Sequence, residues 1–370
     1  MGWDISYHPV DIKWIHKRVL PYVQGHGTLD DLMDDALRIA KVRQRSNAWG
    51  LGLMRLQHKV NDAQREARDK RNQSRGMFQK LLGSNKPEND PSLAFGLPGF
   101  STDRCVWGAP FFICEGDLAK VSELVDQYLG ATEDTVDEIA RGQLVCVDRH
   151  IDQAVHADRI REIIGGSVVE NTHPKSEESE LDDQAIIHSV RWKMDLFRDA
   201  YQAYGTGQKV RDSQGQEHDP KGLFASDFPL AVLEFAAFFR PGWMARGYGW
   251  PTLLLEEASI KSTLWFKKPT PLFAPLLHNV PEIDECLTSA IEQNYSLGGY
   301  IPAELVPEFS NNFEVYLPEI RAQKLSQKWT DADLQPYVEG IRWALQDAKR
   351  RGLGFVEATE VYSGPFGIMN

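Results

Sequence analysis

Apolar residues recur at helical spacing through most of the sequence, and this periodicity constrains the fold more than any other feature. A clear example begins where Thr330 to Asp333 cap a helix that runs to Arg351 and that Gly352 terminates. The same spacing predicts helices over residues 11–23, 53–82, 117–129, 132–140, 143–164, 185–204, 281–294 and 302–328, and one opening at Thr28. Short strands are predicted over residues 105–107, 111–114 and 354–362. The sequence therefore predicts a mainly α fold with a few short β-strands.

Three segments are less regular than these. Pro318 lies inside 302–328 and predicts one helix, or two, broken near that residue. Residues 144–147 could instead begin as a strand, because they are apolar and rich in valine. Residues 208–220 are polar and contain Gly215, which predicts a hairpin or a loop.

The best candidate for a domain boundary is the segment 166–183. The chain has 370 residues, about two domain lengths. The boundary segment combines glycine, a His-Pro pair and a run of carboxylates, a composition typical of a solvated linker. We therefore expect a helical lobe with short strands over 1–165 and a second helical lobe over 184–370. One large body is the alternative.

Charge narrows the class of partner. The chain carries 53 acidic and 41 basic residues, for a formal net charge of −12. Nucleic acid and anionic membranes are poor partners for such a chain, because binding phosphate needs a basic face. A basic protein would be attracted by this field.

The sequence also predicts a cytoplasmic protein. Its longest apolar run, Pro229 to Phe239, is interrupted by Glu234 and is shorter than the roughly 20 residues of a spanning helix. The opening residues lack the pattern of a signal peptide. No two of the four cysteines stand in C-x-x-C spacing, which favours free thiols in a reducing compartment. The cysteines are Cys105, Cys114, Cys146 and Cys286.

Common catalytic motifs are not found, including the P-loop, the G-x-G-x-x-G loop, H-E-x-x-H and G-x-S-x-G. The densest set of metal-ligating residue types is Asp148, His150, Asp152 and His156. Asp152 and His156 would share a helix face and supply two ligands, so a metal-assisted hydrolase is an alternative function. A salt-bridged helix is the simpler interpretation. We expect no enzyme activity, no metal and no cofactor.

Two groups of residues are the candidates for contact with a partner. The first is the most concentrated run of negative charge, which would steer a basic partner: Glu177, Glu178, Glu180, Asp182 and Asp183. The second is Trp243, Tyr248 and Trp250, in a glycine-rich segment beside two arginines, which would anchor it. Core packing is the simpler interpretation of these aromatic residues. A third possibility is an adaptor that contacts RNA or protein through the basic helix between Arg55 and Lys80, although such a stretch is usually a solvated face.

Both ends of the sequence resemble one family. The opening Met1-Gly2-Trp3-Asp4-Ile5-Ser6-Tyr7-His8-Pro9 is similar to the start of bacterial immunity proteins encoded beside type VI secretion effectors, and residues 351–360 strengthen the resemblance. The resemblance implies stoichiometric inhibition, in which the chain binds a cognate secreted toxin that acts in the cytosol, with a nuclease as one candidate. It assigns no binding residues.

Overall fold

The computed structural model describes residues 4–79, 108–174 and 182–361, with side chains left undescribed over 71–79. Its longer helices are α3 (Asp30–Gln79), α4 (Leu118–Gly130), α5 (Glu133–Asp152), α6 (Ala157–Ile164), α8 (Asp183–Ala203), α10 (Phe228–Phe239), α14 (Val306–Ser326) and α15 (Asp331–Arg351). Shorter helices are α1 (Ile12–Trp14), η1 (Ile15–Val19), α2 (Leu20–Val23), α7 (Val168–Asn171), α9 (Pro220–Phe224), α11 (Pro251–Glu257), η5 (Ser262–Leu264), η6 (Thr270–Phe273), α12 (Ala274–Leu277) and α13 (Glu282–Glu285). The predicted mainly α fold with a few strands is confirmed.

A four-stranded antiparallel sheet lies at the centre of the body, in the order β4-β1-β6-β5. Its strands are β1 (Asp4–Val10), β4 (Trp243–Arg246), β5 (Leu297–Ile301) and β6 (Gly354–Thr359). On β1, Ile5 pairs with Ala245 of β4 on one side and with Thr359 of β6 on the other. The first strand of the chain is thus held between segments more than two hundred residues away in sequence.

Helix α15 packs against this sheet. A Cβ atom on Gly340 would lie 2.9 Å from the ring of Tyr7, so the glycine lets the helix approach β1 closely. Buried Glu357 of β6 then holds α11 and β5, because its carboxylate accepts hydrogen bonds from Thr252 N (3.1 Å), Thr252 Oγ1 (2.6 Å) and Gly299 N (3.2 Å). Burial raises the pKa of this carboxyl to about 7.

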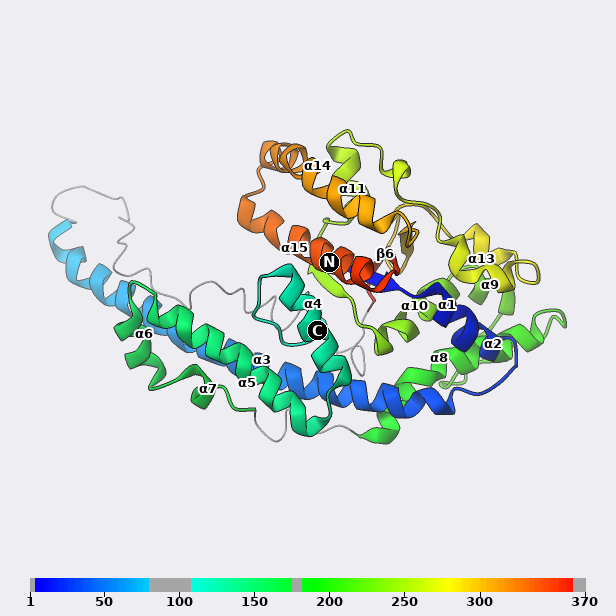
Figure 1. Cartoon of the computed structure of the whole chain (residues 1–370), viewed down its shortest axis with the longest axis horizontal. Coiled ribbons are helices and arrows are strands. Elements are labelled where there is room, and N and C mark those ends of the chain that lie inside the picture. The colour runs from blue at the N-terminus through cyan, green and yellow to red at the C-terminus, as the bar shows by residue number, and fades with distance from the viewer. Residues whose placement is uncertain (1–3, 80–107, 175–181, 362–370) are drawn as a thin grey trace.

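Buried apolar residues form three clusters. One lies among α2, α8 and α10, a second among α4, α14, α15 and the sheet, and a third among α3, α5 and α6. The first two contain residues from both sides of segment 166–183, and β1 pairs only with strands of the second half. This arrangement favours the single-body alternative over two lobes. The third cluster forms an arm that projects from the body in Figure 1.

Several predicted elements differ in the structure. Residues 111–114 form no strand. The backbone N–H of Phe112 instead donates to Ser46 Oγ (2.7 Å) and that of Cys114 to Gln143 Oε1 (3.3 Å). Side chains here satisfy the groups that a neighbouring strand would satisfy. The predicted strand over 105–107 lies outside the described residues.

The helical predictions need three corrections. Helix α14 runs unbroken through Pro318. Proline has no N–H, so one carbonyl of the preceding turn lacks its helical partner. Because Pro318 is exposed, water can satisfy that carbonyl. The predicted helices 132–140 and 143–164 are divided at a different place: α5 is continuous from Glu133 to Asp152, with residues 144–147 helical within it, and α6 begins at Ala157. In 281–294 only Glu282–Glu285 is helical.

The predicted hairpin over 208–220 is confirmed, with β2 (Val210–Arg211) pairing β3 (Glu217–His218).

Helix α3 extends the predicted basic helix toward the N-terminus, to Asp30, and runs to Gln79. Asp62 and Arg65 form an exposed ion pair 3.3 Å apart, one turn from each other. Such pairing fits the simpler interpretation of this stretch as a solvated helix face. Residues 80–82 lie outside the described part of the chain.

Asp137 ties α5 to α3 at the base of the arm. Its carboxylate accepts from Arg45 Nε (2.7 Å), Arg45 Nη2 (2.8 Å) and the indole of Trp49 (2.8 Å). We expect Asp137→Ala to lower the free energy of unfolding by about 1–3 kcal/mol, because the buried indole N–H loses its acceptor. Urea unfolding of this variant beside Glu138→Ala, an exposed neighbour, measures the effect. Equal stability of the two variants would contradict it.

The bond with Arg45 also holds the pKa of the Asp137 carboxyl below its usual range. The stability that the ionised Asp137 carboxyl contributes is therefore present above the ordinary carboxyl pKa, and it is lost as the pH falls through the lowered pKa of the folded chain.

Candidate functional site

The predicted steering residues fall in two groups. Glu177, Glu178 and Glu180 lie outside the described residues. Asp182 caps α8 by accepting from Gln184 N (2.9 Å), and Asp183 pairs with Lys41 of α3 (2.9 Å). These two carboxylates thus stabilise the start of α8, and their use as a steering charge stays a prediction.

The three predicted anchors differ in exposure. Trp243 lies on β4 opposite Tyr7 and is 1% exposed, and Trp250 at the start of α11 is 7% exposed. These two indoles are core residues, as the simpler interpretation predicts, and their burial argues against a direct anchoring role. Tyr248 is 51% exposed and lies at the surface.

Two glycines fix the position of Tyr248. A Cβ atom on Gly249 would lie 1.9 Å from Cδ1 of Tyr337, so this loop can rest on the tyrosine ring only without a side chain. Gly247 has a positive φ of 102°, and the Tyr337 hydroxyl donates to the carbonyl of Arg246. The loop is therefore pinned to α15 on both sides of Tyr248.

Aromatic rings continue from this loop across α15. The Tyr248 and Trp250 rings lie 5.9 Å apart, and the Tyr337 and Trp329 rings lie 5.5 Å apart. We call Tyr248, Trp250, Trp329 and Tyr337 the aromatic patch. A shallow hollow of about 300 Å³ opens beside it, lined by Lys328, Trp329, Asp333 and Tyr337.

Buried Lys324 supports one end of the aromatic patch. Its ammonium lies 4.3 Å from the centre of the Trp329 ring and 2.5 Å from Glu257 of α11. A cation held over an indole face orients the ring. The patch is thus supported by α11, α14 and α15 together.

The metal-type cluster of the sequence is an ion-pair network in the structure. Arg161 of α6 pairs with both Asp148 (2.5 Å) and Asp152 (2.6 Å), and His150 bonds the carbonyl of Cys146. His156 lies at the start of α6. Within residues 4–70, 108–174 and 182–361, no three His, Cys, Asp or Glu side chains converge as metal ligands. These residues therefore form salt bridges on the helices, as the simpler interpretation predicts.

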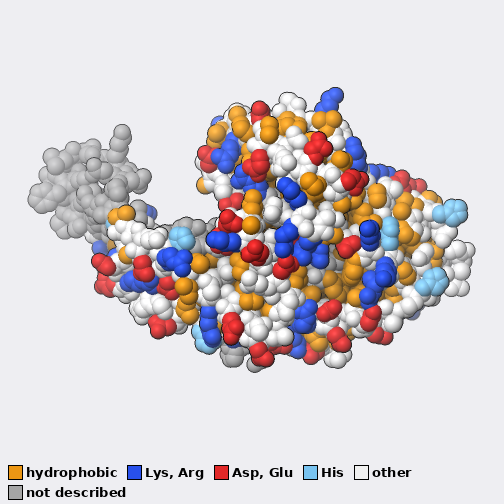
Figure 2. Space-filling model, viewed as in Figure 1, with side chains coloured by type: hydrophobic (Ala, Val, Ile, Leu, Met, Phe, Trp, Pro, Cys, Tyr) orange, Lys and Arg blue, Asp and Glu red, His pale blue; other side chains and the backbone are white. Residues whose placement is uncertain are grey.

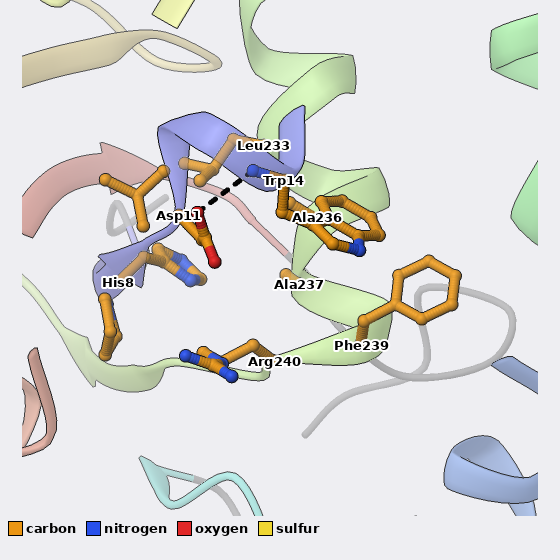
Figure 3. A pocket seen from close by; sticks show the side chains of 10 residues that line it. His8, Asp11, Trp14, Leu233, Ala236, Ala237, Phe239 and Arg240 are labelled. Carbon is orange, nitrogen blue, oxygen red and sulfur yellow. Dashed lines mark hydrogen bonds between the residues drawn. The ribbon is translucent and has the colours of Figure 1, made fainter. Parts of the chain in front are cut away.

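A cavity of about 90 Å³ that sequence reasoning missed lies where β1 runs into α1 and meets the end of α10. Figure 3 shows His8, Asp11 and Arg240 around it, with Trp14 and Phe239 forming an apolar side. We call this the β1–α10 cavity. His8 and Asp11 come from adjoining elements near the start of the chain, whereas Arg240 ends α10.

His8 is 1% exposed, and neither ring nitrogen has a hydrogen-bond partner among the described residues. Burial, and then the charge of Arg43, lowers the pKa of its imidazole to about 3. A Cβ atom on Gly242 would lie 2.4 Å from His8 Nδ1, so the glycine makes room for the ring. An unpaired buried polar group is unfavourable and needs an explanation.

Arg240 and Asp11 bring opposite charges to the β1–α10 cavity. The Arg240 guanidinium makes no ion pair or hydrogen bond with any described residue, and burial and then the charge of Arg351 lower its pKa. Asp11 uses one oxygen to cap α1 by accepting from Trp14 N (3.0 Å). No ion pair joins Asp11 to Arg240 in the described part of the chain.

Partial signals for this cavity were present in the sequence. His8 lies in the opening motif, Asp11 is a recognisable helix cap, and Arg240 follows the most apolar helix. Nothing local indicated that these residues meet, because the strand pairing that joins them is long-range.

Comparison with known proteins gives no relative: no protein-family model, curated protein or solved structure matches this chain. Among the helices that the structure describes, none is long and apolar enough to cross a membrane.

Proposed function

We propose that this chain is an immunity protein that binds a cognate cytosol-acting type VI secretion toxin and blocks it by covering the toxin's working surface. The observation that carries the proposal is the aromatic patch, in which a half-exposed tyrosine is held rigidly at the surface. The resemblance of the opening residues to immunity proteins points in the same direction.

Tyr248 and Trp329 are the members of the patch that reach the surface, above buried Trp250 and Tyr337, and their residue types suit a protein interface. Tyrosine and tryptophan are enriched among residues that dominate binding energy, because they bury a large area with few rotatable bonds. The contacts of Gly247 and Gly249 with Tyr337 order the loop before binding. Less conformational entropy is then lost on association.

Net charge supports a basic partner. Figure 2 shows acidic and basic side chains interspersed on the visible face, without one continuous patch of either sign. The attraction therefore comes from the overall charge of −12 and acts mainly on the association rate. A toxin that binds nucleic acid through a basic face, such as a nuclease, has the complementary charge.

We expect Tyr248→Ala to weaken toxin binding by about thirtyfold, the effect of losing one hot-spot side chain. The probe is the product of the reading frame that neighbours this gene, produced in cells together with the chain. Wild type should restore growth in these cells and the variant should restore it poorly.

Tyr295→Ala is the matched control, because Tyr295 is 66% exposed and lies outside the aromatic patch. Its protection should equal that of wild type. Full protection by both variants would contradict a role for Tyr248, and no protection by wild type would contradict the proposed function.

A further inference from the structure

The β1–α10 cavity is lined by two opposite charges, those of Arg240 and Asp11, which form no ion pair with each other in the described part of the chain. Arg240 makes no close ion pair among the described residues, although the carboxylates of Asp347, Asp11 and Asp126 act on its charge from farther away. Asp11 has a second oxygen that does not cap α1. Figure 3 shows these side chains around one space and not paired with one another. A single occupant that bears both charges would pair with both side chains.

We propose that the β1–α10 cavity binds a small zwitterion of the amino-acid class, with its carboxylate on Arg240 and its ammonium on Asp11. A guanidinium matches a carboxylate through two parallel hydrogen bonds. The ammonium of the ligand donates to the Asp11 oxygen that does not cap α1.

Size limits the ligand. The cavity is small, about 90 Å³, which suits a compact amino acid such as glycine or alanine. Trp14 packs against Phe239, with ring centres 5.1 Å apart, and Leu233 and Ala237 complete an apolar wall. This wall excludes water from one side and so strengthens the two charge pairings.

The charges of Arg240 and Asp11 together select the class of ligand. A simple anion would pair with Arg240 but would meet the carboxylate of Asp11, and a simple cation would meet Arg240. A zwitterion avoids both repulsions. This inference does not depend on the proposed immunity function, because it concerns a different set of residues.

Calorimetric titration of the full chain with glycine, acetate and methylammonium tests the proposal. We expect saturable binding of glycine at least about tenfold tighter than binding of either half-ligand, because only glycine makes both charge pairings. Glycine that fails to bind, or that binds no better than acetate, would overturn the proposal.

Two variants assign the ends of the ligand. Arg240→Gln should weaken glycine binding at least about tenfold. Asp11→Asn keeps a residue that caps helices well but removes the charge, so it should weaken glycine binding and spare acetate. Arg211→Gln, on the exposed β2–β3 hairpin, is the control and should bind glycine as wild type does. Unchanged binding by a folded Arg240→Gln would overturn the proposal.

Discussion

The His8→Leu variant is expected to be more stable than wild type at pH 7, with a free energy of unfolding higher by about 1–3 kcal/mol. The imidazole is buried and its two nitrogens lack partners among the described residues, so a leucine of similar volume removes an unsatisfied polar group. Chemical unfolding of both proteins measures the difference.

The same substitution should change the pH dependence of stability. The pKa of His8 is about 3 in the folded chain and 6.5 when exposed, so the unfolded state binds the proton first as pH falls. The stability conferred by the neutral ring is present above pH 6.5 and is lost toward pH 3. Wild type should lose about 3 kcal/mol more than His8→Leu between pH 7 and pH 4.

His26→Leu is the control for this effect, because His26 is exposed in the turn before α3. It should follow the wild-type curve. The same acid sensitivity in His8→Leu and wild type would show that His8 is solvated or paired. Arg43, Asp11 and Arg240 are the charged groups around the ring, and all are unchanged in both variants.

The Gly249→Ala variant is expected to lose about 3 kcal/mol of stability. The added Cβ would lie 1.9 Å from Cδ1 and 2.3 Å from Cγ of Tyr337, atoms near the base of the ring that cannot swing away as a side-chain tip can. The loop or the ring must shift, and Tyr248 then loses its fixed position. Toxin binding should fall along with stability.

Gly142→Ala is the matched control for Gly249→Ala. Gly142 is exposed in α5, with nothing within 4 Å of an added Cβ atom, so alanine should stabilise the helix by about 1 kcal/mol. The two glycine-to-alanine changes should therefore shift urea unfolding in opposite directions. A destabilising effect that is equal in both would contradict the close packing of Gly249 on Tyr337.

The sequence predicts the helices best where the signal is local. The cap at Thr330 and the terminator at Gly352 bound α15 as expected, because cap residues act on neighbouring backbone groups. The strands β1, β4 and β5 were missed. Their partners are remote in sequence, and β1 is buried on both faces, so it lacks the alternation of polar and apolar residues that reveals a half-buried strand.

The roles of the candidate site residues also depend on long-range contacts, which local sequence does not reveal. Trp243 and Tyr248 are five residues apart, yet one is in the core and the other at the surface. Only the pairing of β4 with β1 and the approach of Tyr337 to Gly249 separate their roles. His8, Asp11 and Arg240 likewise meet through the packing of α10 on the start of the chain.

Equilibrium binding between the purified full chain and the product of the neighbouring reading frame tests the central claim most directly. The account predicts a one-to-one complex with a dissociation constant below about 1 μM, which a standard interface of about 1,600 Å² can supply. Association should slow as salt rises, because the charges are screened. A neighbouring product that forms no complex with the chain would contradict the account.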